Sequence, residues 1–585
     1  MANGVITSKY FWFYLAMCIV AVASLAVTCF RRNSLRIFPV DLLLITFGVE
    51  VLYINYFIFQ NAISTKWILL MHLMILFFYF RVFLQDKKLR FYLLLYLILT
   101  GLVEAIWGLS QLYGFSPSYH SVFKLTGSFF NSGPYSGYLT TVAPIALYQT
   151  LKDSIVLKKK FFCDYFLLYI RFILSILTFA SIILVLPATM SRAAWIAMVI
   201  SCFFVVFFYY LQKEHIKEYL IKRLKKVIFL TFIVIVLVTM SLVEIYHLKK
   251  DSADGRMLIW KTAIQLIPKN PMGVGIGHFS GAYGSEQAVY FKSGKQSKHE
   301  EFIAGNPEYA FNEYLQIIIE FGIVPAIVLF VSFFLIVYLG IKRKAIPETG
   351  GLVSLLIFAF MSYPFNLLPL LIVLVFLMAL ILSKKSYVKV ENVTEKGFTL
   401  NWKFVIFMLI IFCSVLFVSL YHQLPAYKSY QEWNKLKMVE SVDSYPEMKK
   451  DYEKIYPNLS DQTQFLFEYA QCLSKVNEYK QSNLILKQAI KISCDPMLYN
   501  ILGKNYQRLG NYKLAEQNFF ISSHIVPNRI YPYFLLSNLY SENGKTDSAI
   551  LMAKKVLEKK PKVQSTATKE MKVEMKKMVE KIIRK

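Results

Sequence analysis

Apolar runs of roughly 20 residues alternate with short polar loops through the first 421 residues of the chain. A run of about 20 apolar residues is long enough to cross a bilayer as a helix. The pattern predicts about twelve membrane-spanning helices, at 10–30, 37–59, 67–84, 90–112, 134–151, 165–187, 193–211, 227–247, 313–340, 351–365, 366–382 and 403–421. The fold class that follows is an all-α polytopic membrane helix bundle.

The loops between these runs alternate in charge. Loops rich in Lys and Arg lie at 31–36, 86–90, 152–160, 213–226, 342–344 and 384–389. Basic loops of this kind face the cytoplasm. The alternate loops then face outward, at 113–133, 188–192, 248–312 and everything after 421. Residues 351–382 form either two short crossings or a re-entrant hairpin, and this parity decides on which side the C-terminal region lies.

Composition supports the membrane class, since hydrophobic residues make up 56% of the 585 and charged residues 17%. The net charge of +28 sits largely in the short loops. It therefore indicates topology and contact with membrane lipids, and no nucleic-acid partner is expected. The first run, Tyr10–Phe30, is followed by Arg31, Arg32 and Arg36, which favours an anchor over a cleaved signal peptide.

The seven cysteines are scattered without metal-binding spacing, so we expect no metal and no cofactor. Cys472 and Cys494 lie in the polar C-terminal region. They could pair if that region is extracytoplasmic, but two free thiols are the preferred interpretation.

From about residue 461 the chain becomes polar and repeats with a period of 34 residues, with Pro496–Arg529 and Ile530–Val563 in matching register. Both units resemble the tetratricopeptide repeat, and a degenerate unit precedes them at 461–495. We expect a membrane domain at 1–421, a linker at 422–460, an α-solenoid at 461–563 and a Lys-rich capping helix at 564–585. Such repeats stack to bury their apolar faces, and their groove typically holds a peptide or partner protein.

The segment Asp254–Gly322 is the one extended polar excursion among the spans, and it opens with Arg256. Arg192 lies on the same predicted outer face. The guanidinium group binds phosphate bidentately and keeps its charge. Two arginines at one depth could grip a pyrophosphate and stabilise the charge of its departure, as a metal would elsewhere. Arg192 alone reads as an interfacial residue with its head group in water. Two arginines in recognisable motifs favour the functional interpretation.

Two further features mark this excursion. Gly273, Gly275 and Gly277 predict a tight turn that lets the backbone approach substrate or a membrane helix closely. Polar residues then recur at helical spacing on the way into the membrane, at Asn312, Glu313, Gln316 and Glu320. Such residues either cap the helix or are buried for a function.

Together these motifs resemble a known family. The pattern GR…IW…A…P…G.G.G.F followed by NEYLQ…E.G resembles the O-antigen ligase and O-antigen polymerase superfamily, which includes bacterial O-oligosaccharyltransferases. Gly127–Asn131 (GSFFN) resembles its outer-loop motif and Ser191-Arg192 its Ser-Arg motif, while Glu104, Gly108 and Gln111 resemble its fourth-span pattern. The resemblance covers roughly residues 10–420.

The resemblance implies a metal-independent glycosyl transfer on the outer face of a bacterial inner membrane. The donor would be a glycan on undecaprenyl pyrophosphate, and the acceptor a hydroxyl of a protein Ser or Thr or of a lipid-A core. Arg192 and Arg256 would hold the pyrophosphate. We expect the remaining substrate contacts from Asn131, His278, Asn312 and Gln316.

The sequence departs from the family at one position. The family assigns activation of the acceptor to a His in a His-Asn motif, and Phe311 stands there. Another residue could serve as the base. We prefer Glu308 or Glu313 to the other candidates, which are His278, His299, Glu300 and Glu301. Alternatively, leaving-group departure governs the rate, or the protein is inactive. We favour Glu308 or Glu313. The structural alternative for each acid is an ion pair with Lys292, Lys295 or Lys298.

Three functions follow from the sequence. The leading hypothesis is the O-antigen ligase-like oligosaccharyltransferase, with a mild preference for a protein acceptor because of the repeats. The second is a polymerase that joins lipid-linked repeat units. The third is a transporter or non-catalytic membrane scaffold, which leaves the Gly-Arg and Asn-Glu-Tyr-Leu-Gln motifs unexplained.

Overall fold

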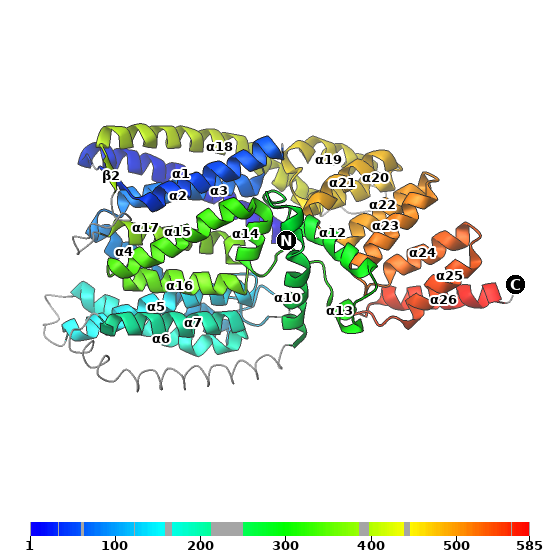
Figure 1. Cartoon of the computed structure of the whole chain (residues 1–585), viewed down its shortest axis with the longest axis horizontal. Coiled ribbons are helices and arrows are strands. Elements are labelled where there is room, and N and C mark those ends of the chain that lie inside the picture. The colour runs from blue at the N-terminus through cyan, green and yellow to red at the C-terminus, as the bar shows by residue number, and fades with distance from the viewer. Residues whose placement is uncertain are drawn as a thin grey trace.

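The computed structural model describes residues 2–32, 34–59, 64–121, 123–157, 166–211, 250–384, 397–437, 445–562 and 564–583. The described chain is almost wholly helical. Two three-residue strands, β1 (Leu35–Ile37) and β2 (Phe398–Leu400), pair antiparallel. Most of the long helices gather in one half of the molecule, and the C-terminal helices form the other half (Figure 1). The all-α prediction is confirmed.

Eight helices in the described residues are long and apolar enough to cross a membrane. They are α1 (Ala2–Arg31), α2 (Pro39–Tyr53, extended by a π-helical turn to Ile58), α3 (Thr65–Phe83), α4 (Lys87–Leu112), α6 (Phe166–Val185), α7 (Arg192–Leu211), α15 (Ile323–Lys342) and α18 (Trp402–Leu436). Helix α5 (Ser132–Leu157) occupies the predicted span at 134–151. The predicted span at 227–247 lies outside the described residues. The chain is thus a multi-pass membrane protein.

Residues 346–383 form two separate short helices, α16 (Ile346–Phe360) and α17 (Leu368–Ser383), joined by a turn that contains the 3-10 helix η4 (Pro364–Asn366). The ends of α16 and α17 that are away from this turn lie close together, because Lys384 Nζ donates to the Lys344 carbonyl oxygen at 2.8 Å. Arg343 also donates to the Leu382 carbonyl oxygen at 2.8 Å. The η4 turn therefore lies at the opposite end of this helix pair.

The predicted span at 313–340 is wrong as one continuous helix. Gly322 breaks it into α14 (Glu313–Phe321) and α15, with a φ of +92° that favours glycine. The glycine-rich turn at 271–277 packs into the break. Val274 N–H donates to the Ile319 carbonyl oxygen at 2.8 Å, and Ile323 N–H donates to the Pro271 carbonyl oxygen at 3.0 Å. The backbone groups that the break releases are thereby satisfied.

The polar excursion folds into α10 (Lys250–Ala263), α11 (Leu266–Lys269), α12 (Phe279–Lys292) and α13 (Lys298–Ile303). These helices have an apolar core of their own, in which Phe279 and Tyr283 are 1% exposed. They lie between the membrane helices and the C-terminal helices (Figure 1).

The C-terminal region continues as a row of helices. They are α19 (Tyr445–Leu459), α20 (Thr463–Lys475), α21 (Tyr479–Ile492), α22 (Pro496–Arg508), α23 (Tyr512–Ile525), α24 (Tyr531–Glu542), α25 (Thr546–Glu558) and α26 (Thr566–Ile583). Successive helices pack in pairs, α20 with α21, α22 with α23 and α24 with α25. Cys472 and Cys494 are buried free thiols, as preferred from the sequence. The tetratricopeptide assignment itself stays a prediction.

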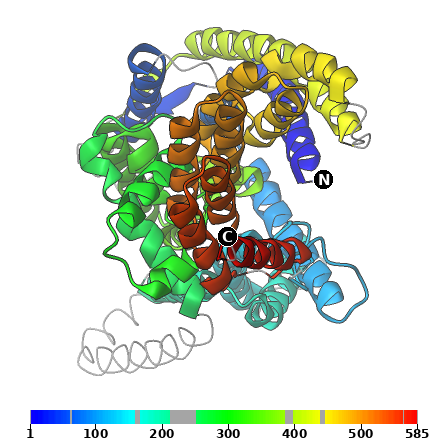
Figure 2. The same ribbon diagram turned by 90° about the vertical axis from the view of Figure 1, so that its right-hand side faces the viewer.

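The excursion and the C-terminal helices lie at the same end of the membrane bundle. Figure 2 views this end, where the C-terminal helices cross the bundle beside the excursion. Other loops contact one another elsewhere in the bundle. Strands β1 and β2 pair there, and Arg31 forms an ion pair with Asp86 at 2.5 Å. In Figure 1, β2 lies at the end of the bundle opposite the C-terminal helices. Helix α18 passes through residue 421 without a break and reaches the C-terminal helices directly.

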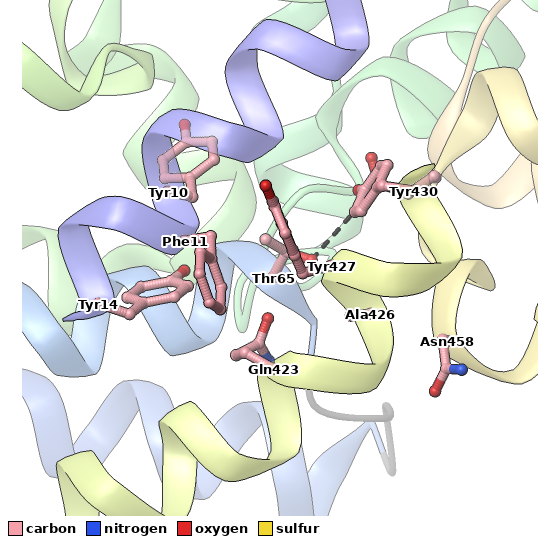
Figure 3. A pocket seen from close by; sticks show the side chains of 10 residues that line it. Tyr10, Phe11, Tyr14, Thr65, Gln423, Ala426, Tyr427, Tyr430 and Asn458 are labelled. Carbon is pink, nitrogen blue, oxygen red and sulfur yellow. Dashed lines mark hydrogen bonds between the residues drawn. The ribbon is translucent and has the colours of Figure 1, made fainter. Parts of the chain in front are cut away.

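A small cavity of about 80 Å³ lies where α1 and α18 meet the start of α3 and the C-terminal helices. Aromatic side chains crowd it (Figure 3), and the ring of Phe11 stacks on that of Tyr427 at 4.2 Å between centroids. Asp461 fastens the same junction, because its carboxylate accepts hydrogen bonds from Thr65 N–H at 2.8 Å and Thr65 Oγ1 at 2.7 Å. The C-terminal helices are thus held to the membrane bundle just before the start of α20.

Candidate functional site

Four predicted site residues line one cavity of about 400 Å³, which we call the arginine cavity: Asn131, Arg192, Arg256 and Glu308. They come from four separated segments of the chain. Its volume falls in the range of about 300–1,000 Å³ that is common for small-molecule sites. Aromatic side chains complete the wall, namely Phe123, Tyr309, Phe311 and Tyr363.

Arg256 projects from α10 and is fixed from two sides. Its Nη1 donates to the Met361 carbonyl oxygen at 2.6 Å, and its guanidinium lies 5.1 Å from the ring centroid of Phe311. Burial lowers the pKa of Arg256, and the charge of the nearby Arg192 lowers it further. Two cations that repel each other across one cavity favour the binding of an anion.

Arg192 is the first residue of α7, so its charge adds to the positive end of that helix dipole. A sharp corner places it there: the 3-10 helix η3 (Pro187–Thr189) is followed by Met190 at a φ of +52°. Trp195 Nε1 closes the corner by donating to the Leu186 carbonyl oxygen at 3.1 Å. A helix N-terminus that carries an arginine is well suited to bind phosphate.

Asn131 reaches the cavity from the loop before α5, and its Nδ2 donates to the Tyr363 hydroxyl at 3.3 Å. Helix α4 holds this loop in place. The Glu104 carboxylate accepts from Ser128 N–H at 3.0 Å, and Gln111 Oε1 accepts from Gly127 N–H at 2.7 Å. The motif residues on α4 thus position the loop rather than line the cavity.

Phe311 stands at the position where the resemblance implies a histidine, and it has a φ of +53°. This left-handed conformation is uncommon outside glycine and is several-fold commoner for Asn, Asp and His than for other residues. The ring lies against Arg256 on one side and makes an edge contact with Tyr363 at 5.4 Å. Tyr309 stacks on Tyr363 at 4.8 Å. Phe311 therefore shapes the aromatic wall and offers no proton acceptor.

Glu308 is the acid that shares the arginine cavity. Burial raises the pKa of the neighbouring Tyr309 hydroxyl, and the Glu308 carboxylate raises it further. The Tyr363 hydroxyl also has a raised pKa because of burial, which the charge of Arg256 partly offsets. The two tyrosines are therefore held neutral, and Glu308 is the group whose chemistry suits a base.

Glu313 and Gln316 point into a different cavity, of about 210 Å³ and largely apolar, between α2, α3, α14, α15 and α17. There Glu313 accepts hydrogen bonds from Phe365 N–H at 2.7 Å and Asn366 Nδ2 at 3.3 Å. Gln316 Nε2 donates to Glu320 at 3.2 Å. Glu313 therefore fixes the turn that carries Tyr363 and lies outside the arginine cavity.

The two remaining predicted contacts are local. Asn312 caps α14, since its Oδ1 accepts from Leu315 N–H at 3.1 Å. His278 precedes α12, and its Nδ1 lies 3.1 Å from the Ile276 carbonyl oxygen. Burial lowers the pKa of His278, so it is neutral more readily than a free histidine. Neither lines the arginine cavity.

The remaining candidate bases, His299, Glu300 and Glu301, make contacts at the surface of the excursion. Glu300 pairs with Lys261 at 3.0 Å, and His299 lies 3.0 Å from Asp254. Glu301 pairs with Lys559 of the C-terminal region at 3.3 Å. The structural alternative thus holds for Glu300 and Glu301, with different lysines from those that the sequence suggested.

The sequence analysis missed Tyr309 and Phe123 of the cavity wall, and it also missed Tyr363. Tyr363 lies in the turn between α16 and α17, which the sequence marked only as a break between apolar runs. The available signal was the polar character of residues 362–366 at the predicted outer side of two spans. The Tyr363 side chain lines the same cavity as the two arginines.

Two arginines, an acid and an aromatic wall in one cavity at the end of the helix bundle suit the binding of an anionic ligand. Residues 177–331 match the family model described as O-antigen ligase. This part of the chain includes Arg192, Arg256, Glu308 and Phe311. The match confirms the resemblance to the O-antigen ligase superfamily for this part of the chain. No curated protein matches the chain.

Proposed function

We propose that the protein transfers a glycan from undecaprenyl pyrophosphate to an acceptor hydroxyl in the arginine cavity. The observation that carries the proposal is the convergence of Asn131, Arg192, Arg256 and Glu308 on this one cavity. Cationic donors aimed at a site of developing negative charge are among the largest contributions to catalysis. The proposed location is the outer, periplasmic face of a bacterial inner membrane.

The proposed reaction is a single displacement. The acceptor oxygen attacks the anomeric carbon, and the bond from that carbon to the pyrophosphate oxygen breaks. The pyrophosphate takes the bonding electron pair, and Arg192 and Arg256 stabilise its charge. The acceptor proton passes to the Glu308 carboxylate. Asn131, Tyr309 and Tyr363 would contact the sugar, because flat aromatic rings and amide groups suit a polyhydroxylated ring.

Glu308 takes the role of base in this proposal in preference to Glu313. It lines the arginine cavity, whereas Glu313 lies in the other cavity and accepts hydrogen bonds from the η4 turn. The observed geometry also gives Phe311 a function in shaping the wall and supporting Arg256.

The experiment that tests the proposal is transfer by the purified protein in lipid nanodiscs, with a labelled undecaprenyl-pyrophosphate glycan as donor. Three acceptors are offered separately: a Ser/Thr peptide, a lipid-A core and a second molecule of donor. Transfer to the peptide or the core supports a ligase or oligosaccharyltransferase. Elongation of the donor alone would indicate the polymerase. No transfer to any acceptor would contradict the proposal and favour a transporter or scaffold.

A further inference from the structure

The C-terminal helices pack against the excursion that carries the site. Two glycines of α12 allow the close approach. A Cβ atom on Gly284 would lie 2.5 Å from the Cys494 Cβ, and one on Gly281 would collide with the Lys491 carbonyl oxygen. Ser280 Oγ donates to Cys494 Sγ at 3.2 Å, and Cys494 is 2% exposed. This interface is packed as tightly as a protein core.

Polar contacts across the interface hold the segment of chain that leads to Glu308. Asn528, just after α23, donates through Nδ2 to the carbonyl oxygens of Phe302 at 3.0 Å and Ala304 at 2.9 Å. Gln287 Nε2 donates to the Gly305 carbonyl oxygen at 2.8 Å and also to that of Ile525. The carbonyl groups of Phe302, Ala304 and Gly305 are thus satisfied by the C-terminal region and by α12.

A second cavity, of about 300 Å³, adjoins the arginine cavity, and we call it the tail cavity. The two share Ser252, Arg256, Pro307 and Phe311 in their walls. Residues 303–306 form one wall of the tail cavity, and Lys562 of the C-terminal region forms another. Lys562 Nζ lies 6.0 Å from the ring centroid of Phe302.

The charged residues that line the tail cavity favour an anionic ligand. Arg256 and Lys562 contribute two positive charges, and Asp251 contributes one negative charge. Its lining residues lie on the excursion and the C-terminal region, and none lies on a candidate membrane span. A ligand can therefore enter without a lipid anchor, which favours a peptide over a glycolipid.

We propose that the tail cavity binds the acceptor beside its reacting hydroxyl, and that the acceptor is a peptide segment bearing a carboxylate near the Ser or Thr. The C-terminal region then forms part of the acceptor site through Lys562, and Asn528 is a positioning residue for the wall of the tail cavity at residues 303–306. This inference rests on the proposed glycosyl transfer and adds its acceptor class.

The test compares two Ser-containing peptides that differ only in Asp or Asn beside the serine. Lys562→Glu is measured against Lys560→Glu, a control two residues away on the exposed surface and outside the cavity wall. Replacing an attractive contact by a repulsive one should raise KM for the Asp peptide roughly fivefold or more. KM for the Asn peptide and for the donor should stay within about twofold. Lys560→Glu should match the wild type.

Binding of the fluorescently labelled Asp peptide to the intact protein, without donor, separates this inference from the proposed reaction. Tighter binding of the Asp peptide than of the Asn peptide, lost in Lys562→Glu, supports the inference even if transfer is slow. Equal binding of both peptides, or equal effects of Lys562→Glu on both, overturns it. Transfer to lipid-A core alone overturns the peptide acceptor while the proposed glycosyl transfer stands. Peptide binding without transfer to any acceptor contradicts the proposed reaction alone.

Discussion

Arg256 combines three contacts in a single side chain: a hydrogen bond to the Met361 carbonyl oxygen, a ring contact with Phe311 and the repulsion of Arg192. The first two hold the guanidinium in one orientation. The third raises its affinity for an anion. A lysine would keep the charge but lose the planar, bidentate geometry.

We therefore expect Arg256→Ala to lower kcat for transfer by about 100- to 1,000-fold, as removal of one donor to a developing negative charge does elsewhere. Arg256→Lys should recover only part of this loss. Lys261→Ala is the matched control, because Lys261 lies on the same helix and pairs with Glu300 at the surface. Initial rates of transfer measure all three. Full activity of Arg256→Ala would refute the role of this residue.

Glu308→Gln and Glu313→Gln separate the two acids that the sequence left open. The first removes the proposed base, so kcat should fall by about 100-fold or more while donor binding is kept. The second keeps an oxygen that can accept from Phe365 N–H, so the rate should change little and the protein should lose some thermal stability. The reverse order of effects on kcat would move the base to Glu313.

The sequence alone identified the two arginines but could not decide which acid is the base. Arg192 and Arg256 were found because loop charge fixes sidedness, and sidedness puts them on one face. Glu308 and Glu313 are only five residues apart, so sidedness cannot separate them. Their directions depend on Asn312, which caps α14 and turns Glu313 toward the membrane helices. The sequence alone does not single out Asn312 as the cap, because several polar residues in this segment could cap a helix.

At the scale of elements, the break between α14 and α15 is built jointly by Gly322 and the turn at 271–277. Gly273 has a φ of +88°, and a Cβ atom there would lie 2.6 Å from the Glu320 carbonyl oxygen. The sequence predicted a tight turn close to either substrate or a membrane helix, and the structure shows this turn packed against α14 and the start of α15. The break itself was missed because residues 313–340 read as one apolar run, and only the distant glycine turn makes an interruption stable.

Gly273→Ala should lower the thermal unfolding temperature clearly and lower transfer with it. The left-handed backbone alone costs roughly 1–2 kcal/mol in a residue with a side chain, and the collision with Glu320 adds to this. Gly294→Ala is the control, since its φ is +68° and nothing lies within 4 Å of the added atom. Scanning fluorimetry in detergent compares the two. Equal shifts would show that the packing at the break contributes nothing.

At the scale of the whole molecule, α12 packs against α21 and α23. This packing joins the membrane domain and the C-terminal helices into one unit. The sequence predicted both parts, because membrane spans are visible as apolar runs and the C-terminal helices as a repeating pattern. It did not predict their contact, since Gly284 with Cys494 and Asn528 with Ala304 have no sequence pattern in common. Long-range docking between two parts is visible only in three dimensions.

The placement of the excursion and the C-terminal helices at one end of the bundle predicts their sidedness. Ser293→Cys on the excursion and Lys569→Cys on α26 should react with a membrane-impermeant maleimide from the same side of sealed vesicles. Lys88→Cys, at the start of α4, should react only from the other side. The unsubstituted protein gives the background from its native cysteines. Labelling of Ser293→Cys and Lys569→Cys from opposite sides would refute the observed arrangement.

The central claim is that Arg192 and Arg256 hold the same pyrophosphate in one cavity. A double-mutant cycle on kcat/KM for transfer, with Arg192→Ala, Arg256→Ala and the pair, tests it most directly. The account predicts that the double variant loses much less than the sum of the single losses, with a coupling of about 1 kcal/mol or more. Strictly additive losses, or full activity in either single variant, would contradict it.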